Sequence, residues 1–62
     1  MNEKALKDIL TFLELGTWAA RKAIKKINEG ESRDNIDYWT GVAETLEETA
    51  EMINRIAKEN KE

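Results

Sequence analysis

The 62-residue sequence contains no cysteine, no proline and no histidine. Without thiol and imidazole groups it lacks the usual ligands and nucleophiles of disulfides, zinc fingers, haem sites and Cys- or His-based catalysis. No apolar run exceeds three residues, far below the ~20 needed to cross a bilayer. The start of the chain carries no apolar leader segment. These features predict a cytoplasmic protein with no membrane association and no cofactor.

A basic surplus is also missing, since 13 acidic residues outnumber 10 basic ones and the net charge is −3. DNA-wrapping proteins need excess Lys and Arg to neutralise phosphates, so that function class is disfavoured. Hydrophobic residues make up 40% and charged residues 37% of the chain, which is typical of an amphipathic helical protein and not of a disordered one.

Strand-type alternation is absent, and one strong turn signal divides the sequence. Gly30 suits the left-handed residue that ends a helix, and Lys25 and Lys26 before it favour a helix C-terminus. Ser32 or Asp34 can then cap a second helix.

We therefore predict an all-α fold with one helical-hairpin domain over residues 1–62. Its helices are expected over about 3–28 and about 33–59, with a turn over about 29–32. A turn this short makes the two helices antiparallel neighbours.

Two glycines leave alternatives open. Gly16 lies inside the first predicted helix, where glycine costs about 1 kcal/mol against alanine. It either allows close packing of a continuous helix or marks a stop, with Thr17 capping a new helix. Gly41 similarly allows the second helix to begin near residue 41, with Thr40 as its cap.

Both predicted helices carry apolar stripes that advance by three and four residues. The second stripe passes through Val42 and Leu46, with Ala43 and Ala50 beside it. A two-helix monomer of this size cannot cover such wide stripes and is marginally stable, so we predict a homodimer or higher oligomer, in the simplest case two hairpins that form a four-helix bundle. The expected core and oligomer contacts are Leu6, Ile9, Leu13, Ala20, Ile24, Ile27, Trp39, Val42, Leu46, Ile53 and Ile56.

Charge is distributed unevenly along the chain. Residues 1–33 carry seven positive and five negative side chains, and residues 34–62 carry three positive and eight negative ones. In an antiparallel pair, the acidic stretch from Glu44 to Glu51 flanks the basic stretch from Arg21 to Lys25, within or between subunits. Exposed pairs contribute little stability, so this pattern selects orientation.

Trp18 falls opposite the apolar stripe of the first helix and is surrounded by charged residues. A large aromatic side chain in such a setting is typical of a partner-binding anchor. The predicted partner surface consists of Leu15, Trp18, Arg21, Lys22 and Lys25. Alternatively, Trp18 is buried in the core or dimer interface, or a kink at Gly16 turns it inward.

Two other functions compete with protein binding. The basic cluster Arg21, Lys22, Lys25 and Lys26 beside Trp18 allows a small RNA-binding regulatory dimer. The acidic spacings Glu44-x-x-Glu47 and Glu48-x-x-Glu51 resemble carboxylate Mg²⁺ sites, but no second acidic pair follows on another helix. We therefore expect a non-enzymatic protein-interaction module (an adaptor, regulator or inhibitor) that binds itself and another protein.

Overall fold

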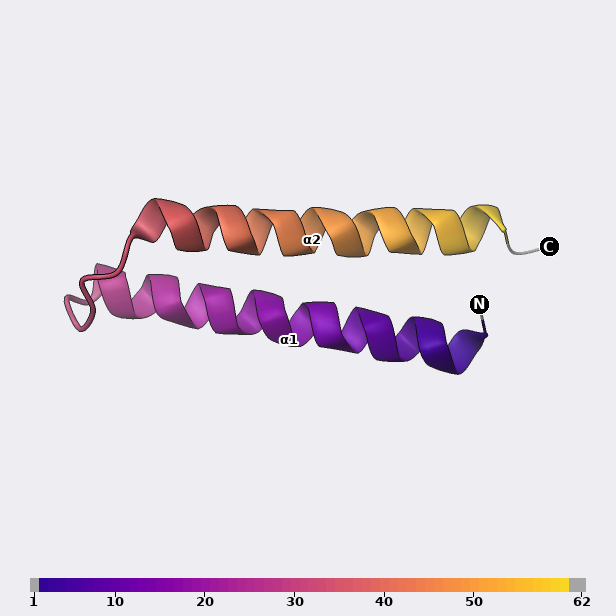
Figure 1. The fold of residues 1–62 in the computed structure, drawn as a ribbon, viewed down its shortest axis with the longest axis horizontal. Helices are drawn as coiled ribbons and strands as arrows, with labels where there is room; N and C mark the ends of the chain where they lie inside the picture. The colour runs from indigo at the N-terminus through magenta and orange to yellow at the C-terminus, as the bar shows by residue number, and fades with distance from the viewer. Residues whose placement is uncertain (1, 61–62) are drawn as a thin grey trace.

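The computed structural model describes residues 2–60 and consists of two antiparallel helices joined by a loop (Figure 1). Helix α1 spans Glu3–Asn28 and helix α2 spans Ile36–Glu59. The two helices pack along their length into a rod of 49 × 17 × 12 Å. Residues 2–60 contain no strand, so the all-α hairpin is confirmed. Met1, Lys61 and Glu62 of the predicted domain lie outside the described residues.

The start of α2 differs from the prediction. Asn35 is its cap, because the Asn35 side-chain oxygen accepts hydrogen bonds from the backbone N–H groups of Asp37 (2.9 Å) and Tyr38 (3.3 Å). The predicted caps Ser32 and Asp34 are wrong. The Ser32 hydroxyl oxygen instead accepts a 3.2 Å bond from the Asp34 N–H within the loop. Helix α2 therefore begins at residue 36, not near 33, and the connection covers residues 29–35.

The end of α1 follows the prediction. Gly30 has a φ of 78°, in the left-handed region that glycine adopts without a steric penalty. Its N–H donates to the Ile27 carbonyl (3.1 Å), and the Glu31 N–H donates to the Lys26 carbonyl (2.8 Å). These bonds satisfy carbonyls that the helix itself leaves unpaired.

Gly16 and Gly41 both lie inside unbroken helices, so a break at Gly16 and a helix start near residue 41 are wrong. A Cβ atom at Gly16 would stand 3.0 Å from a methyl carbon of Leu46, which shows how closely α1 and α2 approach there. Thr17 caps no helix; its hydroxyl donates a 2.9 Å hydrogen bond to the Leu13 carbonyl.

The hairpin core is thin. Leu13, Ala20 and Ala43 are the buried hydrophobic residues, and in the described part of the chain no large side chain is fully buried. Helix α2 is rotated from its expected orientation, since Ala43 from the flanking alanine row is buried while Val42 of the predicted stripe is half-buried. Neither α1 nor α2, over the residues described, has a stretch apolar and long enough to cross a membrane.

Candidate interaction surfaces

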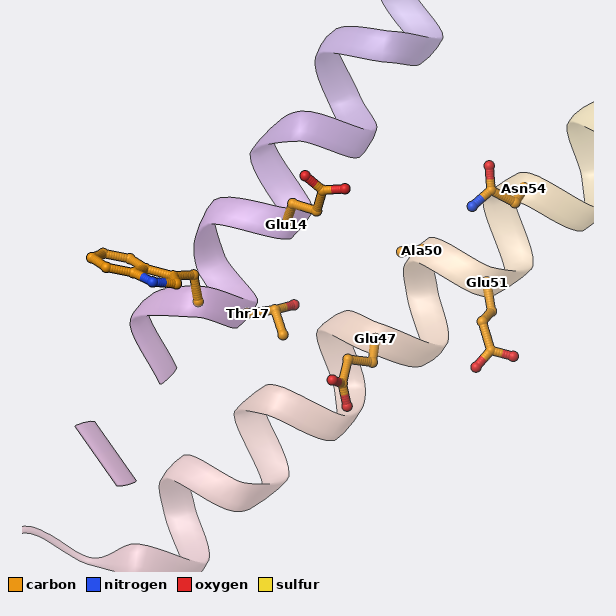
Figure 2. Close-up of a pocket in the computed structure, with 7 residues that line it drawn as sticks. Glu14, Thr17, Glu47, Ala50, Glu51 and Asn54 are labelled. Carbon is orange, nitrogen blue, oxygen red and sulfur yellow. The ribbon is translucent and has the colours of Figure 1, made fainter. Parts of the chain in front are cut away.

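One side of the contact between α1 and α2 is hollowed and is lined mostly by polar residues, whose exposed atoms there are mainly carbon. An open groove of about 680 Å³ runs there, with Glu14 and Thr17 on α1 facing the α2 side chains (Figure 2). The residues that line it are Glu14, Thr17, Trp18, Glu47, Ala50, Glu51 and Asn54. Sequence reasoning did not identify Glu14, Thr17 or Asn54 as groove residues. The sequence marks these residues only by helical spacing: Glu14 and Thr17 are three residues apart on α1, and Asn54 lies four residues after Ala50 on α2.

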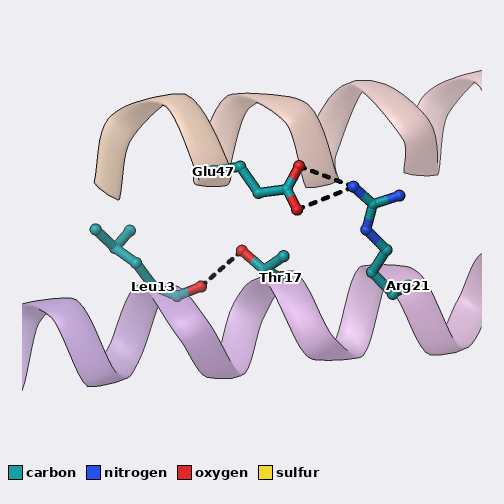
Figure 3. Close-up of polar contacts among 4 residues, drawn as sticks. All are labelled: Leu13, Thr17, Arg21 and Glu47. Carbon is teal, nitrogen blue, oxygen red and sulfur yellow. Dashed lines mark hydrogen bonds and ion pairs between the residues drawn. The ribbon is translucent and has the colours of Figure 1, made fainter. Parts of the chain in front are cut away.

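An ion pair joins the two helices on this polar side. The Arg21 Nη2 atom donates to both carboxylate oxygens of Glu47, at 2.8 and 2.9 Å (Figure 3). The hydrogen bond from Arg21 to Glu47, followed by the attraction of that carboxylate and of Glu44, raises the pKa of the Arg21 guanidinium above its ordinary value. The predicted apposition of acidic and basic stretches is confirmed for Arg21 and Glu47, within one chain.

The opposite side of the contact is apolar and is marked by Gly16 against Leu46. Residues three and four apart share one face of a helix, so the rows through Gly16 and Leu46 both continue along this side. We call the two rows together the apolar face. Its members are Ile9, Phe12, Gly16, Ala19 and Ala23 on α1, and Val42, Leu46, Thr49, Ile53 and Ile56 on α2.

Large side chains of the apolar face are left uncovered in the single hairpin. Phe12 is 74% exposed, Ile56 49% and Ile9 37%. Tyr38 and Met52 are also exposed and border this face on α2. Tyr38 packs edge-on against Trp39, with ring centroids 5.2 Å apart.

The predicted core and oligomer residues fall into three groups. Leu13 and Ala20 are buried. Ile9 and Ile56 are exposed on the apolar face. The half-buried members are Leu6, Ile24, Ile27, Trp39, Val42, Leu46 and Ile53.

Trp18 lies on the surface of α1, with 62% of its area exposed. The Lys22 ammonium stands 5.0 Å from the centre of the Trp18 ring, a cation–π contact. Leu15, one turn before Trp18, is 61% exposed, and Lys25 is exposed one turn beyond Lys22. Burial of Trp18 in the hairpin core and its inward rotation at Gly16 are therefore wrong.

Two of the four residues in the predicted basic cluster have partners within the chain. Arg21 is bound to Glu47, and Lys22 lies over Trp18. The Glu47 carboxylate offsets the charge of Arg21, whereas Lys22 keeps its charge over the neutral Trp18 ring, so the structure adds no support for the RNA-binding alternative.

The proposed carboxylate site on α2 also gains no support. Within residues 2–60, no group of three or more acidic side chains is arranged so that it could hold a metal ion. Glu47, the central carboxylate of the predicted pairs, is bound by Arg21.

Comparisons of the chain with protein-family profiles, with curated proteins and with solved structures find no match.

Proposed function

We propose that this protein is a non-enzymatic interaction module that acts as a cytoplasmic homodimer. Two hairpins would join through their apolar faces into a four-helix bundle. The predicted partner surface around Trp18 (Leu15, Trp18, Arg21, Lys22 and Lys25) would bind another protein. The observation that carries this proposal is the segregation of the hairpin into two sides. Phe12 and its apolar neighbours lie on one side, whereas Trp18 and its charged neighbours lie elsewhere.

The exposed area of the hairpin supports a second copy. A compact protein of 7.1 kDa exposes about 4,100 Å², whereas this chain exposes 5273 Å². The surplus of about 1,200 Å² exceeds the ~800 Å² that each partner buries in a standard specific interface. The radius of gyration agrees, because it is 14.4 Å against about 11 Å for a compact domain of this length.

The position of Trp18 supports a separate partner surface. At about 100° per residue, Trp18 is rotated roughly 120° around α1 from Phe12. Closure of the apolar face would therefore leave Trp18 exposed. Exposed tryptophans rimmed by charge are typical anchors of protein interfaces. With Lys22 and Lys25 beside it, Trp18 suits a partner that offers an apolar pocket bordered by acidic groups.

Self-association is tested by light scattering over a dilution series, with tryptophan fluorescence followed in the same samples. We expect a dimer mass that falls on dilution. In Trp18→Ala the remaining Trp39 emission should shift to the blue as the dimer forms. A monomer mass at every concentration would contradict the homodimer.

Partner binding is tested by quantitative affinity purification from the source cells. The baits are the wild-type chain, Trp18→Ala and, as a matched control, Glu29→Ala in the exposed loop. We expect proteins retained by the wild type and the control to be lost with Trp18→Ala, while its helicity and dimer mass stay unchanged. Equal retention by all three baits would show that Trp18 is not the docking anchor.

A further inference from the structure

We infer that the two hairpins pack with their loops at opposite ends, each α1 antiparallel to α1 of the second copy, around a two-fold axis level with Gly16. This inference rests on the homodimer proposed above and specifies its geometry. The second copy of the chain is the occupant of the apolar face, because the surplus exposed area is more than each copy buries in a standard specific interface.

The distribution of side-chain size along α1 indicates this arrangement. Near Gly16, the apolar face of α1 has large residues, Ile9 and Phe12, before the glycine and small ones, Ala19 and Ala23, after it. One turn further out the order of sizes reverses, with Ala5 and Ile27 each eleven residues from Gly16. A two-fold axis at Gly16 places Ile9 level with Ala23 of the second copy, because each lies seven residues from the axis. Phe12 and Ala19 then lie within about 1.5 Å of the same level. Each large side chain faces a small one, as close packing requires.

Helix α2 obeys the same symmetry. Leu46 contacts Gly16, so the axis crosses α2 near Leu46 and its neighbour Glu47. An axis at Glu47, about 1.5 Å along α2 from the level of Leu46, pairs residues that are equally distant from Glu47. Tyr38 meets Ile56 at a distance of nine residues, Val42 meets Met52 at five, and Thr45 meets Thr49 at two. The exposed apolar side chains that border the face on α2 therefore cover one another.

The alternative two-fold arrangement, with both loops at one end, packs poorly. It would place α1 of each copy against α2 of the other at equal height. Ile9 and Phe12 would then meet Met52, Ile53 and Ile56 near the free ends of the helices. Near the loop, Ala19 and Ala23 would lie level with residues 42–43 and 38–39 of α2, where Val42 and Tyr38 are found. Large side chains would therefore meet large ones near the free ends, and overpacking of this kind destabilises an interface.

A distance between two spin labels distinguishes the arrangements. Because the chain has no cysteine, Glu31→Cys accepts a single label at the exposed loop. With loops at opposite ends, the two labels of a dimer should be about 36 Å apart or more, since 12 residues of α1 separate Gly16 from the helix end. Loops at the same end would bring them within about 20 Å, because packed helix axes lie 8–10 Å apart.

Glu48→Cys is the matched control, because this exposed position on α2 lies almost level with the axis and gives a short distance in either arrangement. A short distance for both variants would overturn the inferred geometry and leave the homodimer standing. If neither labelled variant showed a distance between two labels, at the protein concentrations used for light scattering of the wild type, both the homodimer and this inference would be overturned.

A size exchange provides an independent test. Ala19→Phe places a large side chain opposite Phe12 of the second copy and should weaken association by roughly tenfold or more. Adding Phe12→Ala restores one large and one small residue at each contact, so the double variant should return to within about threefold of wild type. A double variant that associates no better than Ala19→Phe would overturn the antiparallel register.

Discussion

Replacing Phe12 with alanine should weaken self-association by about three orders of magnitude, while Trp18→Ala should leave it near the wild-type value. The two substitutions are closely matched. Both remove an aromatic side chain from α1, and the side chains are 74% and 62% exposed in the single hairpin. They differ in the side of the helix that they occupy, so the comparison isolates the contribution of the apolar face.

The magnitude follows from the exposed fraction of Phe12. Full burial of a phenylalanine side chain contributes about 1.5–3 kcal/mol, and the hairpin leaves 74% of this side chain to be buried. Each copy therefore gains roughly 2 kcal/mol, and the two copies in a dimer gain roughly 4 kcal/mol. At about 1.4 kcal/mol for each tenfold change in Kd, this corresponds to a factor near 1,000. Alanine also favours a helix more than phenylalanine does, so α1 should persist.

Sedimentation equilibrium over a wide concentration range measures this effect for the wild type and both variants. Circular dichroism melts at several concentrations add a second readout, because the Tm of a dimer rises with concentration. Equal association of Phe12→Ala and wild type would refute the assignment of the interface. A similar loss of association in Trp18→Ala would show that the dimer contact includes the Trp18 side of α1 and not only the apolar face.

Three further predictions concern the hairpin itself and use thermal melts followed by circular dichroism. Gly30→Ala should lower stability by about 1 kcal/mol, because residue 30 has a left-handed backbone. Gly41→Ala should raise stability by up to about 1 kcal/mol, because Gly41 lies in a helix with open space around it. If both substitutions shifted the Tm in the same direction, the contrast between the two glycines would be wrong. Asn35→Ala removes the cap of α2 and should cost about 1 kcal/mol, a fall in Tm of about 4–8 °C, and an unchanged Tm would show that the cap is not needed. Glu47→Gln should lower the Tm at low salt but hardly at ~1 M NaCl. Because the pKa of Arg21 is raised above its ordinary value, the guanidinium stays charged at neutral and mildly alkaline pH, and its contribution is lost as the pH rises through the raised value.

The helices themselves could be predicted from spacing, but the start of α2 could not. Ser32, Asp34 and Asn35 all belong to the residue types that cap helices. Composition alone therefore gives three candidates within four positions. The structure selects Asn35, and the first residue of the helix is then Ile36, which is half-buried. A loop of seven residues instead of about four is the consequence.

The orientation of α2 was missed for a different physical reason. Its large row through Val42 and its alanine row through Ala43 have the same period, so periodicity cannot decide which one faces α1. If the two rows are ranked by hydrophobicity, the row of larger residues is expected to face α1. Close approach of two helices favours small ones, and Ala43 is buried whereas Val42 is half-buried.

The exposure of Trp18 could be predicted because its place around α1 depends only on helical spacing and on continuity through Gly16. The contacts around it depend on side-chain rotamers, which a sequence does not specify. Lys22 lies over the Trp18 ring, and Arg21 reaches Glu47 on the other helix. The sequence groups Arg21 and Lys22 in one basic cluster, but in the structure the two side chains have different partners on different helices.

The thin core of the hairpin has a consequence for how such a protein can be controlled. With Leu13, Ala20 and Ala43 as its buried hydrophobic residues, a lone hairpin has little to oppose the entropy of unfolding. In the proposed dimer, the folded fraction then depends on how much protein the cell contains. At protein concentrations below the dissociation constant of the dimer, newly made chains would be open to proteases. At concentrations above it, dimer formation would protect them. The balance of synthesis and degradation would thus set a threshold for partner binding, with no ligand or covalent modification required.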